Sequence, residues 1–414
     1  MPELPESRHD SYAALRIPGF RRFIGSLLTQ TLGSQMQAVV VGWQVYALTH
    51  DPLALGLVGL AEALPFLSTV LLAGHAADRL DRRRMAIAAT ATLVACGLAL
   101  LGLTLDLGPD RSRVGAIYAV IFVSGLARSF LIPARTALAG EIVPREVLIN
   151  SVTWRSSTWQ LAAVIGPAIG GGLYALSGPA AAYCAVVLLL LASVLVLARV
   201  PAAPVRRSAV RDPMLASLAE GVRFVRSQPI FLGAITLDLF AVLFGGAEAL
   251  LPIFAADILR VGPEGLGILR AAHAAGAVAM SLYLSHRRPL ERPGRALLLA
   301  VAVFGMCIIG FGLSRSFGLS VGFLLVGGMA DNVSVVIRSS LLQTLTPPHL
   351  LGRVSAVNSI FIGSSNELGA FESGAAAKLL GTVPSVVIGG SITLLVVAVT
   401  ALKFPALRKV GRLR

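Results

Sequence analysis

The sequence predicts an all-α integral membrane protein with twelve transmembrane helices arranged as two six-helix repeats. First, 56% of the 414 residues are hydrophobic and only 14% are charged, far more apolar than a soluble chain. Second, apolar stretches of about 20 residues, long enough to cross a bilayer, fill nearly the whole chain. Third, these runs are continuous, which favours helices over a barrel because a helix satisfies its own backbone hydrogen bonds in lipid.

The predicted spans are separated by connectors of only a few residues almost everywhere. We expect the first span to be retained as a helix, because its apolar run is too long for a signal-peptide core and lacks a small-residue cleavage site. In chain order the spans are expected at residues 20–48, 53–77, 85–104, 114–135, 151–176, 180–198, 230–258, 265–285, 295–313, 319–342, 354–377 and 384–401.

The net charge of +14 would suggest a nucleic-acid partner in a soluble domain. Here most of the 35 Lys and Arg residues lie in the N-terminal tail, the even-numbered connectors and the C-terminal tail. This bias follows the positive-inside rule. It predicts a multi-pass protein of the bacterial inner membrane with both termini and the central linker in the cytoplasm, in contact with the lipid bilayer and not with nucleic acid.

Positions about 203 or 211 residues apart correspond, which predicts two homologous halves. At the shorter offset Arg135 matches Arg338 and Gly171 matches Gly374, and at the longer offset His75 matches His286. We therefore divide the chain into an N-terminal six-helix half (1–199), a cytoplasmic linker (200–228) and a C-terminal six-helix half (229–414).

Residues 74–84 form a loop too short for a domain and too charged to lie in lipid, which predicts a tight turn at a membrane face. The loop resembles the signature loop of the major facilitator superfamily, Gly-x-x-x-Asp-Arg-x-Gly-Arg-Arg/Lys, except that Asp81 replaces the second glycine. The resemblance implies that fold along the full chain and a conformational clasp between the halves, with the Asp78 carboxylate docked on a neighbouring helix near Gly352. The matching residues are Gly74, Asp78, Arg79, Arg82 and Arg83. The alternative is that the arginines only contact anionic lipid.

A narrower resemblance rests on residues 125–144, followed by Asn150 and a Gly-Pro-x-x-Gly-Gly run in the fifth span. Together they resemble the enterobactin-exporter and macrolide-efflux-like branch of the superfamily. The run in the fifth span also resembles the antiporter motif of drug exporters, although Thr153 and Ala162 replace earlier glycines of that motif. This resemblance favours export of a small-molecule substrate in exchange for protons. The motif residues are Gly166, Pro167, Gly170 and Gly171.

Polar residues inside apolar spans are costly, so each needs a cavity or a partner. In the first span Gln30, Ser34, Gln37 and Gln44 recur along one face, which predicts a cavity lining. The alternative is hydrogen bonding between helices.

Two further polar residues occur in the fifth span. Trp159 and Gln160 are candidates to contact a planar substrate. The alternative for the tryptophan is an anchor at the membrane interface.

Charged residues inside spans are the candidates for ion coupling. Arg128 in the fourth span matches Asp331 in the tenth, and we hypothesise that Asp331 is a protonation or substrate-charge site that faces Arg128 across a central cavity. The alternative is that Asp331 lies solvated at a helix end.

Other charged residues compete for the coupling role. They are Asp238, whose match is Gln30; Glu62, whose match is His273; and Glu367. Two more acids, Glu248 and Glu372, are expected near helix ends.

Motifs of enzymes are missing from the sequence: it contains no phosphate-binding loop, no His-Glu-x-x-His and no nucleophile elbow. Its three cysteines show no metal-ligand spacing, so we expect no metal, no cofactor and no catalytic residue. We predict a monomeric secondary transporter that exports a small amphipathic molecule, such as a siderophore or drug, in exchange for protons by alternating access. Flipping or uptake of a lipid-like substrate, or a non-transporting sensor, are the alternatives.

Overall fold

The computed structural model describes residues 10–105, 110–201, 214–287, 291–347 and 350–411, and within these ranges it contains helices and no strand. The long helices are α1 (Pro18–Thr49), α2 (Pro52–Arg79), α3 (Arg82–Leu105), α4 (Asp110–Ile142), α5 (Leu148–Leu197), α7 (Pro229–Gly245), α9 (Gly262–Ser285), α10 (Pro293–Leu313), α11 (Phe317–Leu345), α12 (Leu351–Leu380) and α13 (Thr382–Lys403). The shorter ones include the linker helix α6 (Met214–Ser227) and the terminal α14 (Pro405–Arg408). The predicted all-helical fold is confirmed.

Local sequence signals explain where several helices begin. Proline occupies the first turn of α1, α2, α7, α9 and α10, where a missing backbone N–H costs nothing. Asp51 accepts a hydrogen bond from the Leu53 amide at 3.0 Å and caps α2. Asp81 accepts one from the Arg84 amide, also at 3.0 Å, at the start of α3. The residue by which this loop departs from the superfamily pattern is therefore a helix cap.

Two glycines 203 residues apart mark equivalent helix boundaries. The long helix α5 is two helices joined at Gly178, whose φ of 78° is left-handed, and Pro179 follows it. Gly381, with φ of 90°, separates α12 from α13. Left-handed backbone strongly favours glycine. The predicted boundary between the fifth and sixth spans thus falls at the kink inside α5.

The predicted seventh span is interrupted. α7 ends at Gly245, and the chain continues through the 3₁₀ turn η3 (Ala247–Leu250), the short α8 (Leu251–Ile253) and the π-helical turn η4 (Phe254–Ile258). A broken helix at membrane depth requires that its freed carbonyls be covered by protein or by water.

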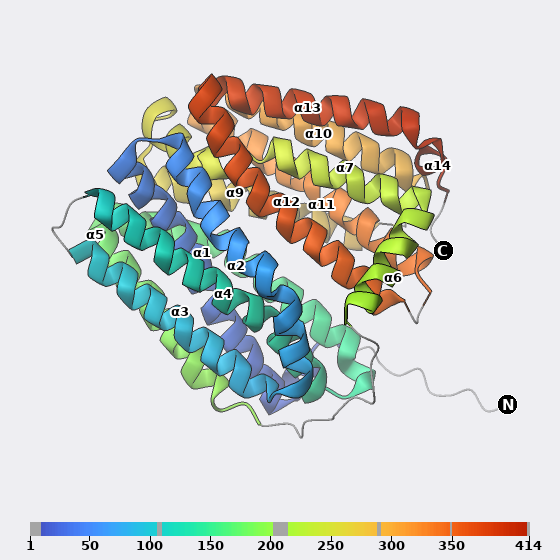
Figure 1. Cartoon of the computed structure of the whole chain (residues 1–414), viewed down its shortest axis with the longest axis horizontal. Helices are drawn as coiled ribbons and strands as arrows, with labels where there is room; N and C mark the ends of the chain where they lie inside the picture. Colours follow the sequence, from blue (N-terminus) through green and yellow to red (C-terminus); the bar gives the residue numbers. More distant parts are fainter. Residues whose placement is uncertain (1–9, 106–109, 202–213, 288–290, 348–349, 412–414) are drawn as a thin grey trace.

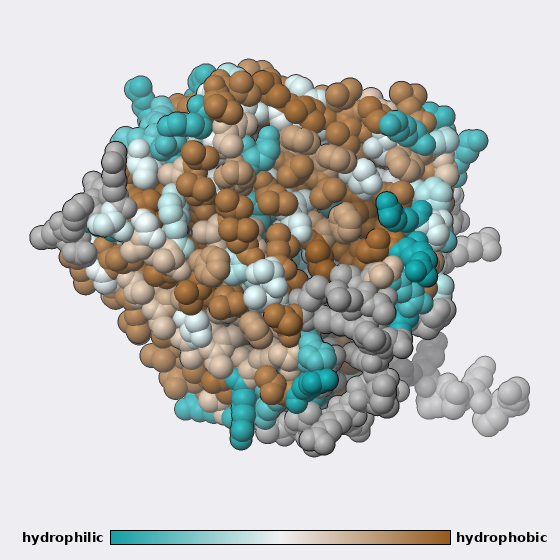
Figure 2. All heavy atoms as spheres, viewed as in Figure 1, coloured by the Kyte–Doolittle hydropathy of each residue, from teal (hydrophilic) through white to brown (hydrophobic). Residues whose placement is uncertain are grey.

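In the described part of the chain, nine helices are long and apolar enough to cross a membrane, and α5 is one of them despite its kink. α1 and α12 are long but fall below this hydropathy because polar residues run along them. Figure 2 shows hydrophobic side chains across the middle of the visible face and hydrophilic ones mainly toward its margins. The chain is therefore a multi-pass membrane protein.

The helices form two bundles, α1–α5 and α7–α14, which lie side by side in Figure 1. In the first bundle α1 packs on α5, and α4 packs on α2 and α3; in the second, α11 packs on α9 and α10, and α7 packs on α12 and α13. The bundles meet along α2–α12 and α5–α9, and α6 packs on α12.

We call the two ends of the molecule the Asp51 end, which holds the α1–α2 connection, and the Asp81 end, which holds the α2–α3 turn. One apolar core draws residues from both bundles, including Val45, Phe254 and Leu266, and lies toward the Asp51 end. The two other cores each stay within one bundle and lie toward the Asp81 end. The bundles are thus joined by shared packing at one end.

Candidate functional site

Glycines allow the two bundles to approach closely near the Asp51 end. A Cβ on Gly171 of α5 would lie 2.3 Å from the Pro263 carbonyl oxygen in the α9 helix, and one on Gly374 of α12 would lie 2.7 Å from the Gly56 Cα in α2. Gly171 and Gly374 are matched positions, so both seams use the same packing. Neither position accepts a larger residue without separating the helices.

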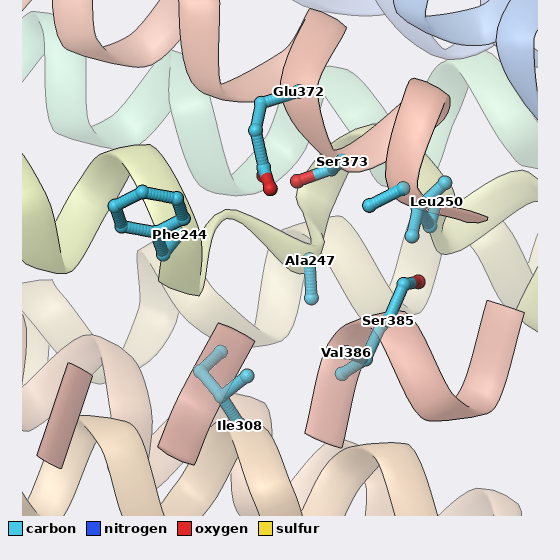
Figure 3. Close-up of a pocket in the computed structure, with 9 residues that line it drawn as sticks. Phe244, Ala247, Leu250, Ile308, Glu372, Ser373, Ser385 and Val386 are labelled. Atoms are coloured by element: carbon cyan, nitrogen blue, oxygen red, sulfur yellow. The ribbon is translucent and has the colours of Figure 1, made fainter. Parts of the chain in front are cut away.

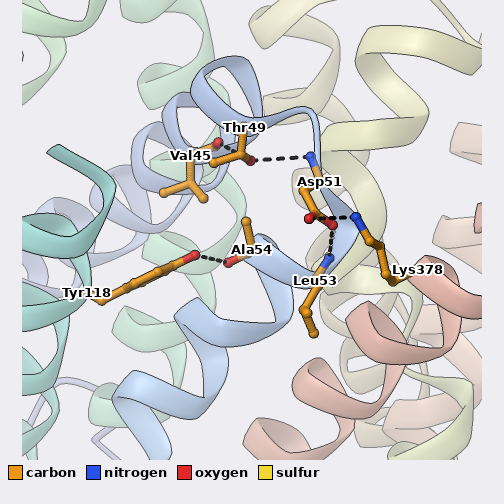
Figure 4. A network of polar contacts seen from close by, with 7 residues as sticks. All are labelled: Val45, Thr49, Asp51, Leu53, Ala54, Tyr118 and Lys378. Carbon is orange, nitrogen blue, oxygen red and sulfur yellow. Dashed lines mark hydrogen bonds and ion pairs between the residues drawn. The ribbon is translucent and has the colours of Figure 1, made fainter. Parts of the chain in front are cut away.

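Polar contacts tie the bundles at the same end. Lys378 of α12 donates to the Asp51 carboxylate at 2.8 Å, beside the hydrogen bond from Leu53 (Figure 4). Burial alone would raise the pKa of the Asp51 carboxyl, but the hydrogen bonds from Lys378 and the Leu53 amide outweigh it and hold the pKa below its usual value. Tyr46 of α1 donates to Asp257 of η4, and these two residues are themselves 211 positions apart. Sequence reasoning identified neither contact.

The signature loop at the Asp81 end contacts only its own bundle among the interactions that the structure describes. Arg82 pairs with Glu141 of α4 at 2.5 Å, and Arg83 donates to the carbonyls of Leu197 and Ala198 at the end of α5.

The remaining loop residues make no described contact with the second bundle. Gly74 is half-buried and Arg79 is exposed, while the side chain of Asp78 lies outside the described residues. The clasp therefore stays a prediction. Glu141 was missed in the sequence, where nothing distinguished it from a solvated helix end.

The N-terminus of α12, the expected docking place of Asp78, is covered by the linker helix. Glu220 of α6 forms an ion pair with Arg353, and a Cβ on Gly221 would lie 2.9 Å from the Arg353 carbonyl oxygen. The sequence had indicated only a cytoplasmic linker at this position.

Two buried arginines at matched positions have different partners. Arg135 of α4 donates to the amide oxygen of Gln30 on α1, and Gln30 in turn donates to Ser34 at 2.9 Å. Arg338 of α11 pairs instead with the Asp238 carboxylate on α7 at 2.6 Å. The sequence had matched Gln30 with Asp238, and the structure places both of them against the matched arginines.

A second set of matched residues lies beside these arginines. Arg128 of α4 forms an ion pair with Glu62 of α2, and Asp331 of α11 lies 3.9 Å from His273 of α9. Each of these residues pairs within its own bundle, and no described ion pair joins Arg128 to Asp331, so their facing across a cavity stays a prediction. His273 also lies 4.0 Å from Glu248. Helix spacing alone did not reveal which way each side chain turns.

Glu367 of α12 adds charge where the bundles meet. It interacts electrostatically with Glu62 and Arg128 of the first bundle and with Arg270 of the second. Glu62 is ten residues into α2, roughly 15 Å from its start at 1.5 Å per residue. This charged group therefore lies near mid-membrane, and Arg270 is a member that the sequence did not single out.

The polar stripe of α1 serves contacts between helices in this structure. Gln30, Gln37 and Gln44 are all buried, and Gln44 bonds both Thr104 and Tyr183. For this stripe the geometry favours the alternative to cavity lining.

The residues singled out in the fifth span divide into exposed and packed ones. Trp159 is 55% exposed, and Gln160 bonds Ser156 on its own helix. In the Gly-Pro motif, Gly166 and Gly170 pack on α1, and the Pro167 carbonyl meets Gly267 of α9.

Two small cavities lie in the second bundle. One, of about 230 Å³ of space not filled by protein atoms, is lined by Asp238, Asp331 and Ser334 together with apolar residues. The other, of about 220 Å³, has Glu372 and Ser373 on its α12 wall next to the break after α7 (Figure 3). No group of three or more His, Cys, Asp or Glu that suits a metal ion occurs within the described ranges.

Comparison with known proteins identifies the family. The family model described as "Transmembrane secretion effector", one of the MFS families, matches residues 9–412. The enterobactin exporter EntS of Escherichia coli O1:K1 is 30% identical over 349 residues, covering 84% of this chain and 81% of that protein, and EntS of Shigella flexneri is 30% identical over 351 residues.

Solved structures share the fold. A peptide transporter of the POT family has a TM-score of 0.77 at 11% identity over 97% of this chain and 99% of its own. A bacterial homologue of the human lysosomal transporter Spinster, in an inward-facing and unoccupied conformation, has a TM-score of 0.70 at 13% identity over 96% of this chain and 99% of its own. The chain belongs to the major facilitator superfamily, and it is a secondary transporter of the branch that contains the enterobactin exporters, not an enzyme.

Proposed function

We propose that this protein exports a small amphipathic molecule of the siderophore class across the bacterial inner membrane in exchange for protons. The observation that carries the proposal is the 30% identity to the enterobactin exporter along 84% of the chain. The chain contains no nucleotide-binding motif, so an ion gradient is the energy source. One copy contains both bundles, and we propose that the protein acts as a monomer.

We further propose that twelve spans form two repeats, with the N-terminal half at 1–199, the linker at 200–228 and the C-terminal half at 229–414, and that the halves rock about their seams. The shared core, the glycine seams and the Asp51–Lys378 pair all support closure at the Asp51 end. By the positive-inside rule the Asp81 end is cytoplasmic. The structure then corresponds to an inward-open state that is ready to load an exported substrate.

The signature loop fits this assignment as a released clasp. In the inward-open state Arg82 and Arg83 are held by Glu141 and the end of α5, within their own half. When the Asp81 end closes, the loop moves to the N-terminus of α12, where helix N–H groups favour a carboxylate such as that of Asp78. In that movement it meets α6, which covers this terminus through the Glu220–Arg353 pair.

Transport is tested with the purified full chain in liposomes of phosphatidylethanolamine and phosphatidylglycerol, with enterobactin as the probe. An acid lumen is expected to drive enterobactin accumulation that a protonophore collapses, because outward protons exchange for the substrate. Uptake no faster than in protein-free liposomes would contradict the proposal. A fluorescent phospholipid run in parallel tests the lipid alternative, and its flipping without enterobactin movement would replace the proposed substrate class.

Alternating access is tested by locking the closed end. A bismaleimide joining Asp51→Cys to Lys378→Cys, in a background without Cys96, Cys184 and Cys307, is expected to abolish transport because the Asp51 end cannot open. Each single cysteine treated with the same reagent is the matched control and is expected to keep transporting. Transport by the protein in which these two cysteines are cross-linked would exclude rocking about these seams.

A further inference from the structure

We propose that the exchanged proton is bound in the C-terminal half alone, by a cluster of Asp238, Asp331 and Arg338 around one cavity, and that the matched N-terminal cluster binds no proton. This inference rests on the proposed proton-coupled export. Proton binding in this half would release helix α7 from helix α11.

The first element of the cluster is a buried ion pair between α7 and α11. Asp238 and Arg338 are 2.6 Å apart, and each side chain is only 8% exposed. The Arg338 Nε also donates to Ser334, at 3.3 Å. A buried charge is tolerated only with a partner, so this pair holds α7 against α11 as long as Asp238 is ionised.

The second element is a cavity that two carboxylates share. Asp238 of α7 and Asp331 of α11 both line the same small cavity, with Ser334 between Asp331 and Arg338 along α11. The space is enough for about one water molecule, which the polar atoms of Asp238, Asp331 and Ser334 can hold by hydrogen bonds. The Asp331 side chain is 33% exposed and that of Asp238 is 8% exposed, so a proton reaches Asp331 first.

The charges of the cluster leave room for one proton. Two carboxylates and one guanidinium sum to one negative charge, and a single bound proton makes the cluster neutral. When that proton sits on Asp238, Arg338 loses its ionic partner on α7 and turns to Asp331, seven residues earlier on its own helix. Proton binding thereby releases α7 from α11, and loss of the proton to water restores the tie that the structure shows.

Few other charged groups act on these two acids. Among the described residues Asp238 interacts electrostatically with Arg338 and Asp331 only, although α7 packs against several other helices. Asp331 interacts with His273 of α9, Glu248 of η3 and Arg338. His273 and Glu248 are therefore the neighbouring groups whose effects have to be separated from those of the cluster.

The N-terminal half has the same frame but no acid at the positions matched with Asp238 and Asp331. Gln30 stands at the position of Asp238 and bonds the matched Arg135, and an amide does not titrate. Arg128 stands at the position of Asp331 and is already paired with Glu62. The Gln30–Arg135 contact also shows that an amide can satisfy a buried arginine in this fold, so Asp238→Asn is expected to fold.

The test follows the opening of the Asp81 end as a function of pH without any substrate. Spin labels are placed at Gly140→Cys and Gln343→Cys, matched and exposed positions on α4 and α11, in a background without the three native cysteines. Distances between the labels are measured by pulsed electron paramagnetic resonance in mildly acidic and mildly alkaline buffer. Acid is expected to deplete the long-distance population in the otherwise unmodified protein, because the Asp238–Arg338 pair belongs to the state open at this end.

Variants then assign the titrating group. Asp238→Asn is expected to abolish the pH-dependent redistribution, whereas Asp238→Glu and the matched Gln30→Ala are expected to keep it. A redistribution that survives Asp238→Asn, that is absent in the unmodified protein, or that is lost only in His273→Gln or Glu248→Gln would overturn the inference.

A second measurement separates this inference from the proposed function. In liposomes Asp238→Asn is expected to lose enterobactin accumulation driven by a pH gradient but to keep exchange of labelled for unlabelled enterobactin, which needs no proton. Gradient-driven accumulation by Asp238→Asn would refute the inference and leave export intact. Failure of the unmodified protein to move enterobactin would refute the proposed function, while the spin-label distances would still report on the cluster.

Discussion

The two bundles place an acid and a base at matched positions on matched helices, in exchanged order. In the first, Glu62 of α2 pairs with Arg128 of α4; in the second, His273 of α9 lies beside Asp331 of α11. In both bundles a glycine one turn before the α4 or α11 residue brings the helices together. A Cβ on Gly125 would lie 2.5 Å from the Glu62 carbonyl oxygen, and a Cβ on the matched Gly328 would lie 2.0 Å from that of His273.

This comparison separates what the backbone provides from what the side chains provide. The helix contacts are nearly the same in both bundles, so the positions are equivalent. The arginines at 135 and 338 have an amide partner in one bundle and a carboxylate partner in the other. Similar helix packing can therefore hold a buried arginine against an amide in one bundle and against a carboxylate in the other.

The largest difference is expected when each buried arginine is removed. Arg338→Met leaves Asp238 buried without a cation and should cost about 3–5 kcal/mol. Arg135→Met leaves only neutral partners and should cost about 1–3 kcal/mol. Thermal unfolding in detergent at neutral pH measures both losses. Equal losses would show that a buried carboxylate left without its arginine costs no more than a buried amide left without its arginine.

The helix contact at the matched glycines gives a smaller, paired effect. Gly328→Ala and Gly125→Ala should each destabilise by about 1–3 kcal/mol, with the larger loss at Gly328, because the added Cβ meets a backbone carbonyl. Gly322→Ala on α11 is the control, since its Cβ meets nothing within 4 Å. If Gly322→Ala were as harmful as Gly328→Ala, the close contact would not be the cause.

The smallest effect is expected at the Asp51–Lys378 pair, which has no equivalent on the other seam, where Gly262 and Ala175 occupy the matched positions. Lys378→Met should shift the balance away from the described state by at most about 1 kcal/mol, because the pair is partly exposed. Lys378→Arg is the control. Label distances across the Asp51 end measure the shift, and a several-fold larger change would mean that this pair, rather than the seams, holds the end closed.

The pH dependence of that pair follows from the lowered pKa of Asp51. The contribution is complete above the ordinary aspartate pKa, near ~3.9, and is lost only as the pH falls through the lower folded value. Between mildly acidic and alkaline buffer it should stay constant. If the effect of Lys378→Met changed across that range, a group other than Asp51 would be titrating at this end.

Sequence reasoning succeeded where local patterns carry the information. Hydropathy predicted the membrane fold, and the loop at 74–84 and the motif of the fifth span identified the superfamily. The internal matches paired Gln30 with Asp238, and the structure places these two residues against the matched arginines Arg135 and Arg338. Sequence reasoning did not predict that Arg128 pairs with Glu62 or that Asp331 lies beside His273, because matched positions show where residues sit in each half but not which neighbour each side chain meets. It missed Glu141, Arg270, Lys378 and the Tyr46–Asp257 contact, since partners far apart in sequence leave no periodic signal.

The sequence by itself determined the class of this protein, because continuous apolar runs require helices in lipid. Only the tertiary structure decided the pairing of its charges and the end at which the bundles close. Both depend on the rotation of each helix about its axis and on the tilt of one bundle against the other. Those quantities are set by the sum of many small packing contacts, which no single stretch of sequence contains.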